Sequence, residues 1–292
     1  MTRVLVTGGS GKAGRACIAD LLDHGYAVAN ADRTPPAEHR CPFVAVDLTD
    51  FGQTIEALSA IDDRIHGVDA VVHLAAIPAP GLYPNALTFQ NNILSTYHIF
   101  EAARRLGIKH VVWASSETVL GLPFDSPPPY APLDEDYPGR PESAYSLSKL
   151  LGEEMARQFC RWDPTLKIIG LRFSNIMEPT DYAGFADFQD DPRRRKWNLW
   201  AYIDARDAAQ AIRKSLEAPI TGAEVFIIAN ADSVMRRPNA ELMAEQFPTV
   251  PLAAEIGPNE TLLSITKARR MLGYEPQHSW RDQDDADELR LA

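Results

Sequence analysis

The stretch Val4-Leu-Val-Thr-Gly-Gly-Ser-Gly-Lys-Ala-Gly14 decides the fold of this chain. Its apolar first half predicts a short buried strand at 3–7, and the helical spacing of apolar residues beyond it predicts a helix over 12–24. Glycines 8, 11 and 14 form the pattern G-x-x-G-x-x-G between the two. Such glycines permit a tight turn, close backbone approach to a pyrophosphate and close helix–strand packing, and the helix N-terminus attracts phosphate. The stretch predicts a dinucleotide-binding turn, with a merely flexible turn as the alternative.

Strand and helix patterns alternate on either side of this turn as far as residue 173. The strands are apolar and β-branched throughout, as in a parallel sheet that helices cover on both faces. The predicted fold class is therefore α/β, a doubly wound parallel sheet of the Rossmann type with its ligand crevice at the carboxyl ends of the strands. The predicted strands are 3–7, 27–31, 43–46, 69–74, 110–115 and 167–173, and the predicted helices are 12–24, 51–61, 85–106 and 143–159.

Beyond residue 173 the regular pattern loosens. Segment 174–201 is rich in Asp, Pro, Arg and Trp, and it is followed by a helical stretch at 204–216 and a strand at 224–229. Short helical patterns occur near 238–247 and 266–272. We predict a cofactor-binding core of 1–173 plus 202–230 and a small C-terminal substrate-binding lobe of 174–201 plus 231–292.

The composition excludes several classes of protein. The 292 residues are 45% hydrophobic and 24% charged, as in an average globular protein, and the net charge is −11. An acidic chain repels phosphate backbones and anionic lipid, so we expect neither a nucleic-acid nor a membrane partner. The three cysteines and seven histidines show no metal-ligand spacing, so we expect no metal and a reducing, cytoplasmic location. Neither a signal-peptide pattern nor an apolar run of membrane-spanning length is present.

An acidic residue follows the second predicted strand. Asp32 lies 18 residues beyond Gly14, where its carboxylate can accept hydrogen bonds from both ribose hydroxyls and repel a 2′-phosphate. This favours NAD over NADP. Lys12 and Arg33 favour NADP instead, because either side chain could pair with a 2′-phosphate. The alternative role of Asp32 is to cap the strand end.

Three side chains suggest proton transfer. Tyr145 and Lys149 lie one helical turn apart, and Ser115 and Ser116 end the preceding strand at the crevice. A phenol has a pKa near 10 and is a poor base, but a neighbouring ammonium favours the phenolate. We expect a serine hydroxyl to donate to the same substrate oxygen. A tyrosine and a lysine at this spacing also occur on ordinary solvated helix faces.

Eight short motifs carry a family resemblance. Over about residues 1–230 they resemble the extended short-chain dehydrogenase/reductase superfamily, in its NAD-dependent epimerase/dehydratase family. The resemblance implies an NAD-dependent sugar dehydrogenase or epimerase, with Tyr145 as acid/base, Lys149 as its activator and Ser116 as hydroxyl donor. The motifs are TGGSGKAG (7–14), ADR (31–33), VDL (46–48), HLAA (73–76), NILST (92–96), SSETVLG (115–121), YSLSK (145–149) and RFSN (172–175).

The resemblance also implies where the cofactor binds. We expect it to contact Gly8, Ser10, Gly11, Lys12, Ala13, Asp32, Arg33, Asp47, Leu48, Leu74, Ala75, Ala76, Asn92, Ser115, Tyr145, Lys149 and Ile176.

Departures from the family pattern restrict the reactions and substrates that we expect of this chain. Dehydratases resemble Thr-Asp-Glu at 116–118, but this chain has one carboxylate there, Glu117, followed by Thr118, which disfavours dehydration. We expect Glu117, Thr118 and Asn175 to bind substrate, with a salt bridge or solvated carboxylate as the alternative for Glu117. Leu120 and Ser95 argue against close identity with UDP-galactose 4-epimerases. Few residues lie outside the predicted cofactor-binding core, and a lobe this small favours a substrate smaller than a nucleotide sugar.

The segment RKWNLW (195–200) followed by YID (202–204) resembles the short members of uronate dehydrogenase type. That resemblance implies Arg195 as a substrate anion contact, with Arg193 and Arg194 as competitors and a solvated basic run as an equal alternative. The wider family resemblance implies a homodimer formed by the helices at 85–106 and 143–160, although their apolar stripes are also what ordinary core packing requires. The function expected is hydride transfer between NAD and a hydroxyl-bearing carbon of a sugar or sugar acid. The alternatives are a UDP-hexose 4-epimerase and a non-catalytic dinucleotide-sensing module.

Overall fold

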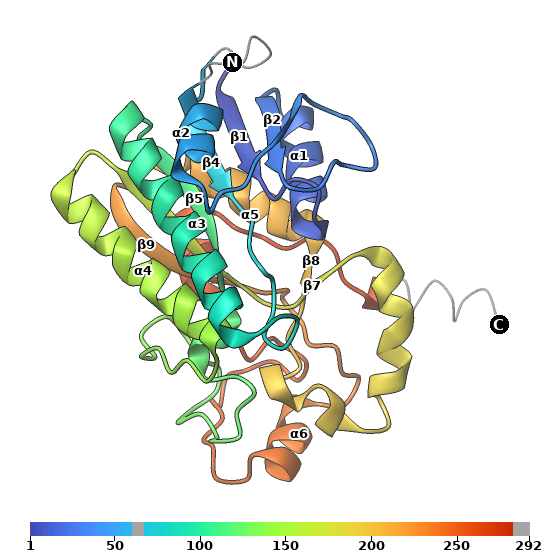
Figure 1. Ribbon diagram of the computed structural model, residues 1–292. Helices are drawn as coiled ribbons and strands as arrows, with labels where there is room; N and C mark the ends of the chain where they lie inside the picture. The colour runs from blue at the N-terminus through green and yellow to red at the C-terminus, as the bar shows by residue number, and fades with distance from the viewer. Residues whose placement is uncertain (60–66, 283–292) are drawn as a thin grey trace.

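A parallel sheet of seven strands forms the centre of the computed structural model, which describes residues 1–59 and 67–282 (Figure 1). The strand order reverses between β1 and β4, which is the switch point where doubly wound sheets bind ligands. The doubly wound prediction is confirmed. In sheet order the strands are β3 (Phe43–Ala45), β2 (Ala27–Asp32), β1 (Arg3–Thr7), β4 (Ala70–His73), β5 (His110–Ser116), β6 (Lys167–Phe173) and β9 (Gly222–Ile228).

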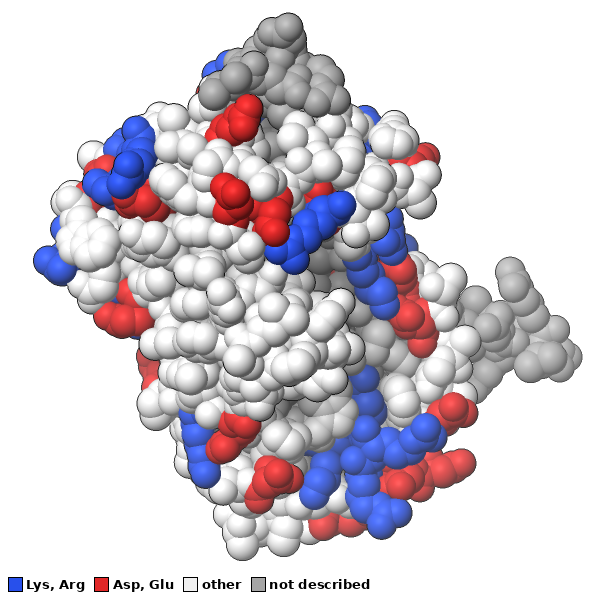
Figure 2. All heavy atoms as spheres, viewed as in Figure 1, with Lys and Arg blue, Asp and Glu red and all other residues white. Residues whose placement is uncertain are grey.

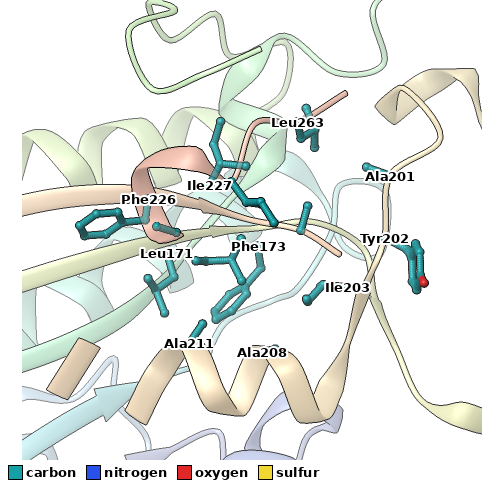
Figure 3. Packing of buried hydrophobic residues seen from close by; sticks show 14 of the residues in the cluster. Leu171, Phe173, Ala201, Tyr202, Ile203, Ala208, Ala211, Phe226, Ile227 and Leu263 are labelled. Carbon is teal, nitrogen blue, oxygen red and sulfur yellow. The ribbon is translucent and has the colours of Figure 1, made fainter. Parts of the chain in front are cut away.

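Helices cover both faces of this sheet. Side chains alternate along a strand, so Val4 and Val6 of β1 enter one core and Leu5 enters the other. The first core includes α1 (Lys12–Asp23) and α5 (Ala205–Glu217), and the second includes α2 (Phe51–Ser59), α3 (Asn85–Leu106) and α4 (Ala144–Trp162). Figure 3 shows Phe173 of β6 lying over Ala208 and Ala211 of α5.

The predicted elements match closely, with small shifts at their ends. Helix α4 continues to Trp162, beyond the predicted end at 159, and it begins with a capping box in which Ser143 and Ser146 satisfy each other's backbone groups. Strand β9 begins at Gly222, two residues before its predicted start. The last two residues predicted for the helix at 51–61 lie outside the described part of the chain.

Short elements at 174–204 and at 239–246 (α6) lie beyond the carboxyl ends of the strands, with α6 at the bottom of Figure 1, whereas the helix at 266–272 packs against β9 and α5. The sequence did not predict the first pair, β7 (Ile176–Met177) and β8 (Ile203–Asp204), which are two residues each and pair in parallel. Three 3₁₀ segments join them, followed later by two helices. These are η2 (Pro179–Phe188), η3 (Pro192–Arg194), η4 (Lys196–Asn198), α6 (Asn239–Gln246) and α7 (Thr266–Leu272).

No helix within residues 1–59 and 67–282 is long and apolar enough to cross a membrane.

Candidate active site

The glycine loop is as tight as the spacing predicts. Gly8 has a φ of +70°, and a Cβ there would lie 2.6 Å from the backbone nitrogen of Ala75. A Cβ on Gly14 would lie 2.2 Å from the carbonyl oxygen of Gly8. Helix α1 begins after Gly11 with no side-chain cap among the described residues, so its first N–H groups are available to an anion.

An open pocket of about 1180 Å³ runs from this loop to helix α4. The space-filling view shows the surface hollowed between the upper and lower parts, with charges of both signs along the rim (Figure 2). Most predicted site residues line this pocket. They are Gly8, Ser10, Gly11, Lys12, Ala13, Asp32, Arg33, Leu48, Leu74, Ala75, Ala76, Ser115, Ser116, Glu117, Thr118, Tyr145, Lys149, Asn175 and Ile176.

Three predicted site residues, Asp47, Asn92 and Arg195, do not line the pocket. The first two hold its wall in place. The amide of Asn92 accepts from the backbone nitrogen of Ile77 at 2.8 Å and donates to its carbonyl at 3.0 Å. Asp47 is ion-paired with Arg33. Burial acts to raise the pKa of Asp47, but hydrogen bonds from Arg33 and Thr49 lower it to about 2.

At the loop end, the charged side chains already have partners within the chain. The Asp32 carboxylate accepts from the backbone nitrogens of Ser10 and Thr34, both at 3.1 Å, so it caps the strand end as well as lining the pocket. Lys12 is ion-paired with Asp181 of η2 at 2.5 Å, and Arg33 with Asp47. The two cations that could receive a 2′-phosphate are therefore both engaged.

At the opposite end, the pocket brings together the three predicted proton-transfer residues. Tyr145 is in the first turn of α4, and it lines the same end of the pocket as Ser116 at the end of β5. Ser116 Oγ also accepts from the hydroxyl of Thr118 at 3.0 Å. The ammonium of Lys149 lies 5.7 Å from the centre of the Tyr145 ring and donates to the carbonyl of Ala114 at 2.7 Å.

The expected lowering of the Tyr145 pKa is wrong for this structure. Burial, helped by the negative charge of Glu117, raises the pKa of Tyr145 to about 12, although the hydrogen bond to Ser116 acts to lower it. Burial also lowers the pKa of Lys149 to about 8. Desolvation is therefore the largest effect on both groups, and Tyr145 holds its proton at neutral pH.

Glu117 and Arg195 are both buried, and only Glu117 lines the pocket. Glu117 accepts from Ser174 at 2.7 Å and from Asn198 at 3.2 Å. Burial raises its pKa to about 7, while the charge of Arg195 acts to lower it. The guanidinium of Arg195 donates to the carbonyl of Ala201 at 2.8 Å and lies 5.0 Å from the ring centre of Trp197, which does line the pocket.

The competing arginines also have partners elsewhere. Arg193 is ion-paired with Asp191 at 2.7 Å, and Arg194 donates to the carbonyl of Asp187 at 2.8 Å. The structure therefore brings none of the three arginines of the basic run onto the pocket wall, which differs from the anion contact expected at Arg195. The chain's own carboxyl and carbonyl oxygens occupy their guanidinium groups instead.

One supporting residue was missed by the sequence reasoning. Glu153 is buried, accepts from the hydroxyl of Ser115 at 2.6 Å and binds Arg172 with two hydrogen bonds of 2.9 Å. It fixes the end of β5 beside Ser116. A signal was available, because Glu153 lies one helical turn beyond Lys149 on the same helix.

The doubly wound sheet and the glycine loop at its switch point are the features of a Rossmann-type dinucleotide-binding fold. The model of the NAD dependent epimerase/dehydratase family matches residues 4–229, and the chain belongs to this family.

Named relatives fall into two groups. UDP-glucose 4-epimerases of Mus musculus and Arabidopsis thaliana are 30% and 33% identical, over 70% and 68% of this chain. These matches span 61% and 58% of the two epimerases, so the chain covers only about three-fifths of their length. A uronate dehydrogenase of Pseudomonas syringae pv. tomato is 27% identical over 75% of this chain and 71% of its own length.

Solved structures support the same fold. A short-chain dehydrogenase/reductase superfamily protein from Agrobacterium tumefaciens with bound NAD has a TM-score of 0.71 and 24% identity, and the match covers 99% of both chains. A mutated uronate dehydrogenase has a TM-score of 0.67 and 24% identity over 99% of this chain and 86% of its own. At these identities the likeness concerns the fold alone.

Proposed function

We propose that this protein is an NAD-dependent oxidoreductase that moves a hydride between nicotinamide and a hydroxyl-bearing carbon of a free sugar or a sugar-acid-like molecule. One observation carries the proposal. Ser116, Tyr145 and Lys149 converge at one end of a pocket whose other end is the glycine loop with Asp32. The distance between these ends is bridged by a single continuous cavity, as a dinucleotide with its substrate requires.

The residues at the loop end fit a dinucleotide. A Cβ at Gly8 or Gly14 would clash with the backbone of Ala75 or Gly8, so these glycines keep the turn tight, and the first N–H groups of α1 are available to a pyrophosphate. Asp32 would accept from the adenosine ribose, and Lys149 would donate to the nicotinamide ribose. When bound, the nicotinamide supplies the site that accepts or returns the hydride.

We infer that the cofactor is NAD rather than NADP. Asp32 would repel a 2′-phosphate, and Lys12 and Arg33, which could attract one, are ion-paired with Asp181 and Asp47. The charge pattern of the loop end therefore favours a ribose with two free hydroxyls.

Tyr145 and Ser116 would carry out proton transfer at the substrate oxygen. The substrate oxygen would lie between their two hydroxyls, since both residues line the pocket. The phenol form of Tyr145, favoured by burial, donates a proton to a carbonyl oxygen in the reductive direction. In the oxidative direction Tyr145 must act as phenolate, and the positive charges of Lys149 and of an oxidised nicotinamide would stabilise that form.

The substrate would be covered by the short elements beyond the sheet. We propose that 174–201 and 231–292 form the substrate-binding lobe and that 1–173 with 202–230 form the cofactor-binding core. Trp197, Ser174 and Asn175 bring this lobe to the pocket wall. The lobe is small, which favours a free sugar over a nucleotide sugar.

An assay of substrates separates the proposal from its alternatives. The protein is mixed with NAD and a panel of free aldoses, uronic acids and UDP-hexoses, and reduced cofactor is followed by absorbance. Net reduction of NAD by a free sugar or sugar acid is the expected result. Conversion of a UDP-hexose without net reduction would instead indicate a 4-epimerase, which the epimerase relatives make the second candidate. Tight NAD binding with no turnover would indicate a sensing module.

We also infer a homodimer that packs through α3 and α4. These helices lie side by side and expose large apolar side chains on their outer faces (Figure 1). Four of these side chains are 39% to 47% exposed, namely Leu87, Tyr97, Leu147 and Leu151. An apolar face shared by two helices suits a four-helix bundle with a second copy.

We place the protein in a reducing compartment, the cytoplasm. Cys17, Cys41 and Cys160 are all free, and two of them are buried, where they act as small apolar side chains.

A further inference from the structure

The substrate end of the pocket carries carboxylates and lacks an available cation. Among the described residues that line the pocket, the cations are Lys12, Arg33 and Lys149. The first two lie at the loop end in ion pairs, and the ammonium of Lys149 donates to the carbonyl of Ala114. The substrate end is lined instead by Glu117 and Glu142.

Two arginines near this end already have partners within the chain. Arg140 is ion-paired with Glu142 at 2.9 Å. Arg195 is buried, and its guanidinium donates to the carbonyl of Ala201 at 2.8 Å. Neither guanidinium belongs to the pocket lining.

Hydrogen bonds hold the carboxylate of Glu117 in a fixed position. Its two carboxylate oxygens accept from Ser174 and Asn198, at 2.7 Å and 3.2 Å, and the side chain is fully buried within the protein while still reaching the pocket wall. It follows Ser116 directly in the chain, so it stands beside the group that would bind the reacting oxygen. Above about pH 7, where Glu117 is ionised, a second carboxylate brought here would meet a like charge in a desolvated setting.

We propose that the substrate is an uncharged polyhydroxylated molecule, a neutral sugar or polyol, because Glu117 lines the substrate end of the pocket and the guanidinium groups of Arg140 and Arg195 do not. This inference rests on the proposed function and specifies its substrate class. The carboxylate of Glu117 and the amide of Asn175 would instead bind hydroxyl groups. Sugar acids would be rejected by the like charge.

Matched pairs of sugars test this inference. D-Glucose, D-galactose and D-mannose are each compared with the hexuronic acid of the same stereochemistry, which differs only in a carboxylate at C6. We expect kcat/KM for NAD reduction to be at least about tenfold higher for the neutral member of the pair that is turned over. Equal values, or preference for the acid, would overturn the inference while leaving the proposed oxidoreductase function in place.

A binding measurement keeps the two proposals distinguishable. If no sugar reduces NAD, the proposed function fails, and saturation-transfer NMR of the same pairs with the NAD-saturated protein decides the inference alone. Binding of the neutral hexose without its acid supports the inference. Binding of the acid, or of neither, overturns it.

A substitution of Glu117 tests whether this residue causes the preference for neutral sugars over sugar acids. Glu117→Gln removes the charge and keeps the shape, so we expect it to raise kcat/KM for the acid relative to the neutral sugar by at least about fivefold. Glu154→Gln makes the same chemical change at an exposed carboxylate of α4 that pairs with Arg157, and it should leave the ratio unchanged. An unchanged ratio in a folded Glu117→Gln protein, checked by circular dichroism, would overturn the role of Glu117, and the wild-type comparison stands without the variant.

Discussion

The phenol of Tyr145 is the single group on which proton transfer should depend. Tyr145→Phe keeps the ring and removes the hydroxyl, so we expect turnover to fall by at least about a hundredfold. NAD affinity should change little, because the ring and Lys149 remain. Tyr26→Phe is a matched control, since its hydroxyl bonds to Glu217 far from the pocket. Steady-state rates near the wild-type value for Tyr145→Phe would exclude Tyr145 as acid/base.

Glu117 should make the stability of the protein depend on pH. Burial raises its pKa from 4.5 to about 7, so the folded protein holds this proton more tightly than the unfolded chain. The resulting stabilisation is complete below about pH 4.5 and is lost as the pH rises through about 7. Glu117→Gln stays uncharged at every pH. Its free energy of unfolding relative to wild type should therefore rise with pH, by at most about 3 kcal/mol.

Urea unfolding of the wild type and Glu117→Gln at about pH 5 and about pH 8 measures this difference. Glu154→Gln again serves as the control, because its carboxylate is exposed. A stability difference that is the same at both pH values would show that the Glu117 carboxyl titrates normally.

Single residues differ in how far the sequence could predict them. The glycines and Asp32 follow from local spacing, because the turn and the strand end that position them are local features. The raised pKa of Tyr145 and the burial of Arg195 were not predictable in this way. Both depend on how much water the surrounding elements exclude, which is a property of tertiary packing.

At the scale of elements, the close contact between the first turn and α1 is the most sensitive point. Gly14→Ala would normally favour a helix, but its Cβ would lie 2.2 Å from the carbonyl oxygen of Gly8. We expect that clash to displace α1, abolish NAD binding and lower the melting temperature by several degrees, which calorimetry and NAD titration measure.

Gly184→Ala is the matched control for this change. A Cβ at Gly184 has no heavy atom within 4 Å, so stability and NAD binding should stay at the wild-type level. If Gly14→Ala bound NAD as well as Gly184→Ala does, the account of the glycine loop would be wrong.

Elements with a strong repeating pattern were predicted well, and short ones were not. The seven sheet strands and five covering helices follow from apolar runs and helical spacing. Strands β7 and β8 are two residues long, too short for any period to show, and they exist because the backbones at Ile176 and Ile203 meet in the folded chain. The path of segment 174–201 across the pocket is likewise set by long-range contacts.

For the whole molecule, the apolar face of α3 and α4 predicts association. Replacing Leu147 and Leu151 together by Asp should convert a dimer to a monomer without unfolding it, because both side chains are about 40% exposed in the single chain. Light scattering coupled to gel filtration at micromolar concentration measures the mass. A wild-type protein that is already monomeric would contradict the dimer.

The central claim is that a hydride leaves a sugar carbon and remains on the cofactor at the end of turnover. The most direct measurement uses an aldose deuterated at every carbon, with NAD and, separately, NADP, followed by mass spectrometry of the cofactor. The account predicts one deuterium in reduced NAD for each sugar oxidised, with much slower labelling of NADP. Unlabelled cofactor, with all deuterium retained in a sugar whose stereochemistry has changed, would contradict net oxidation.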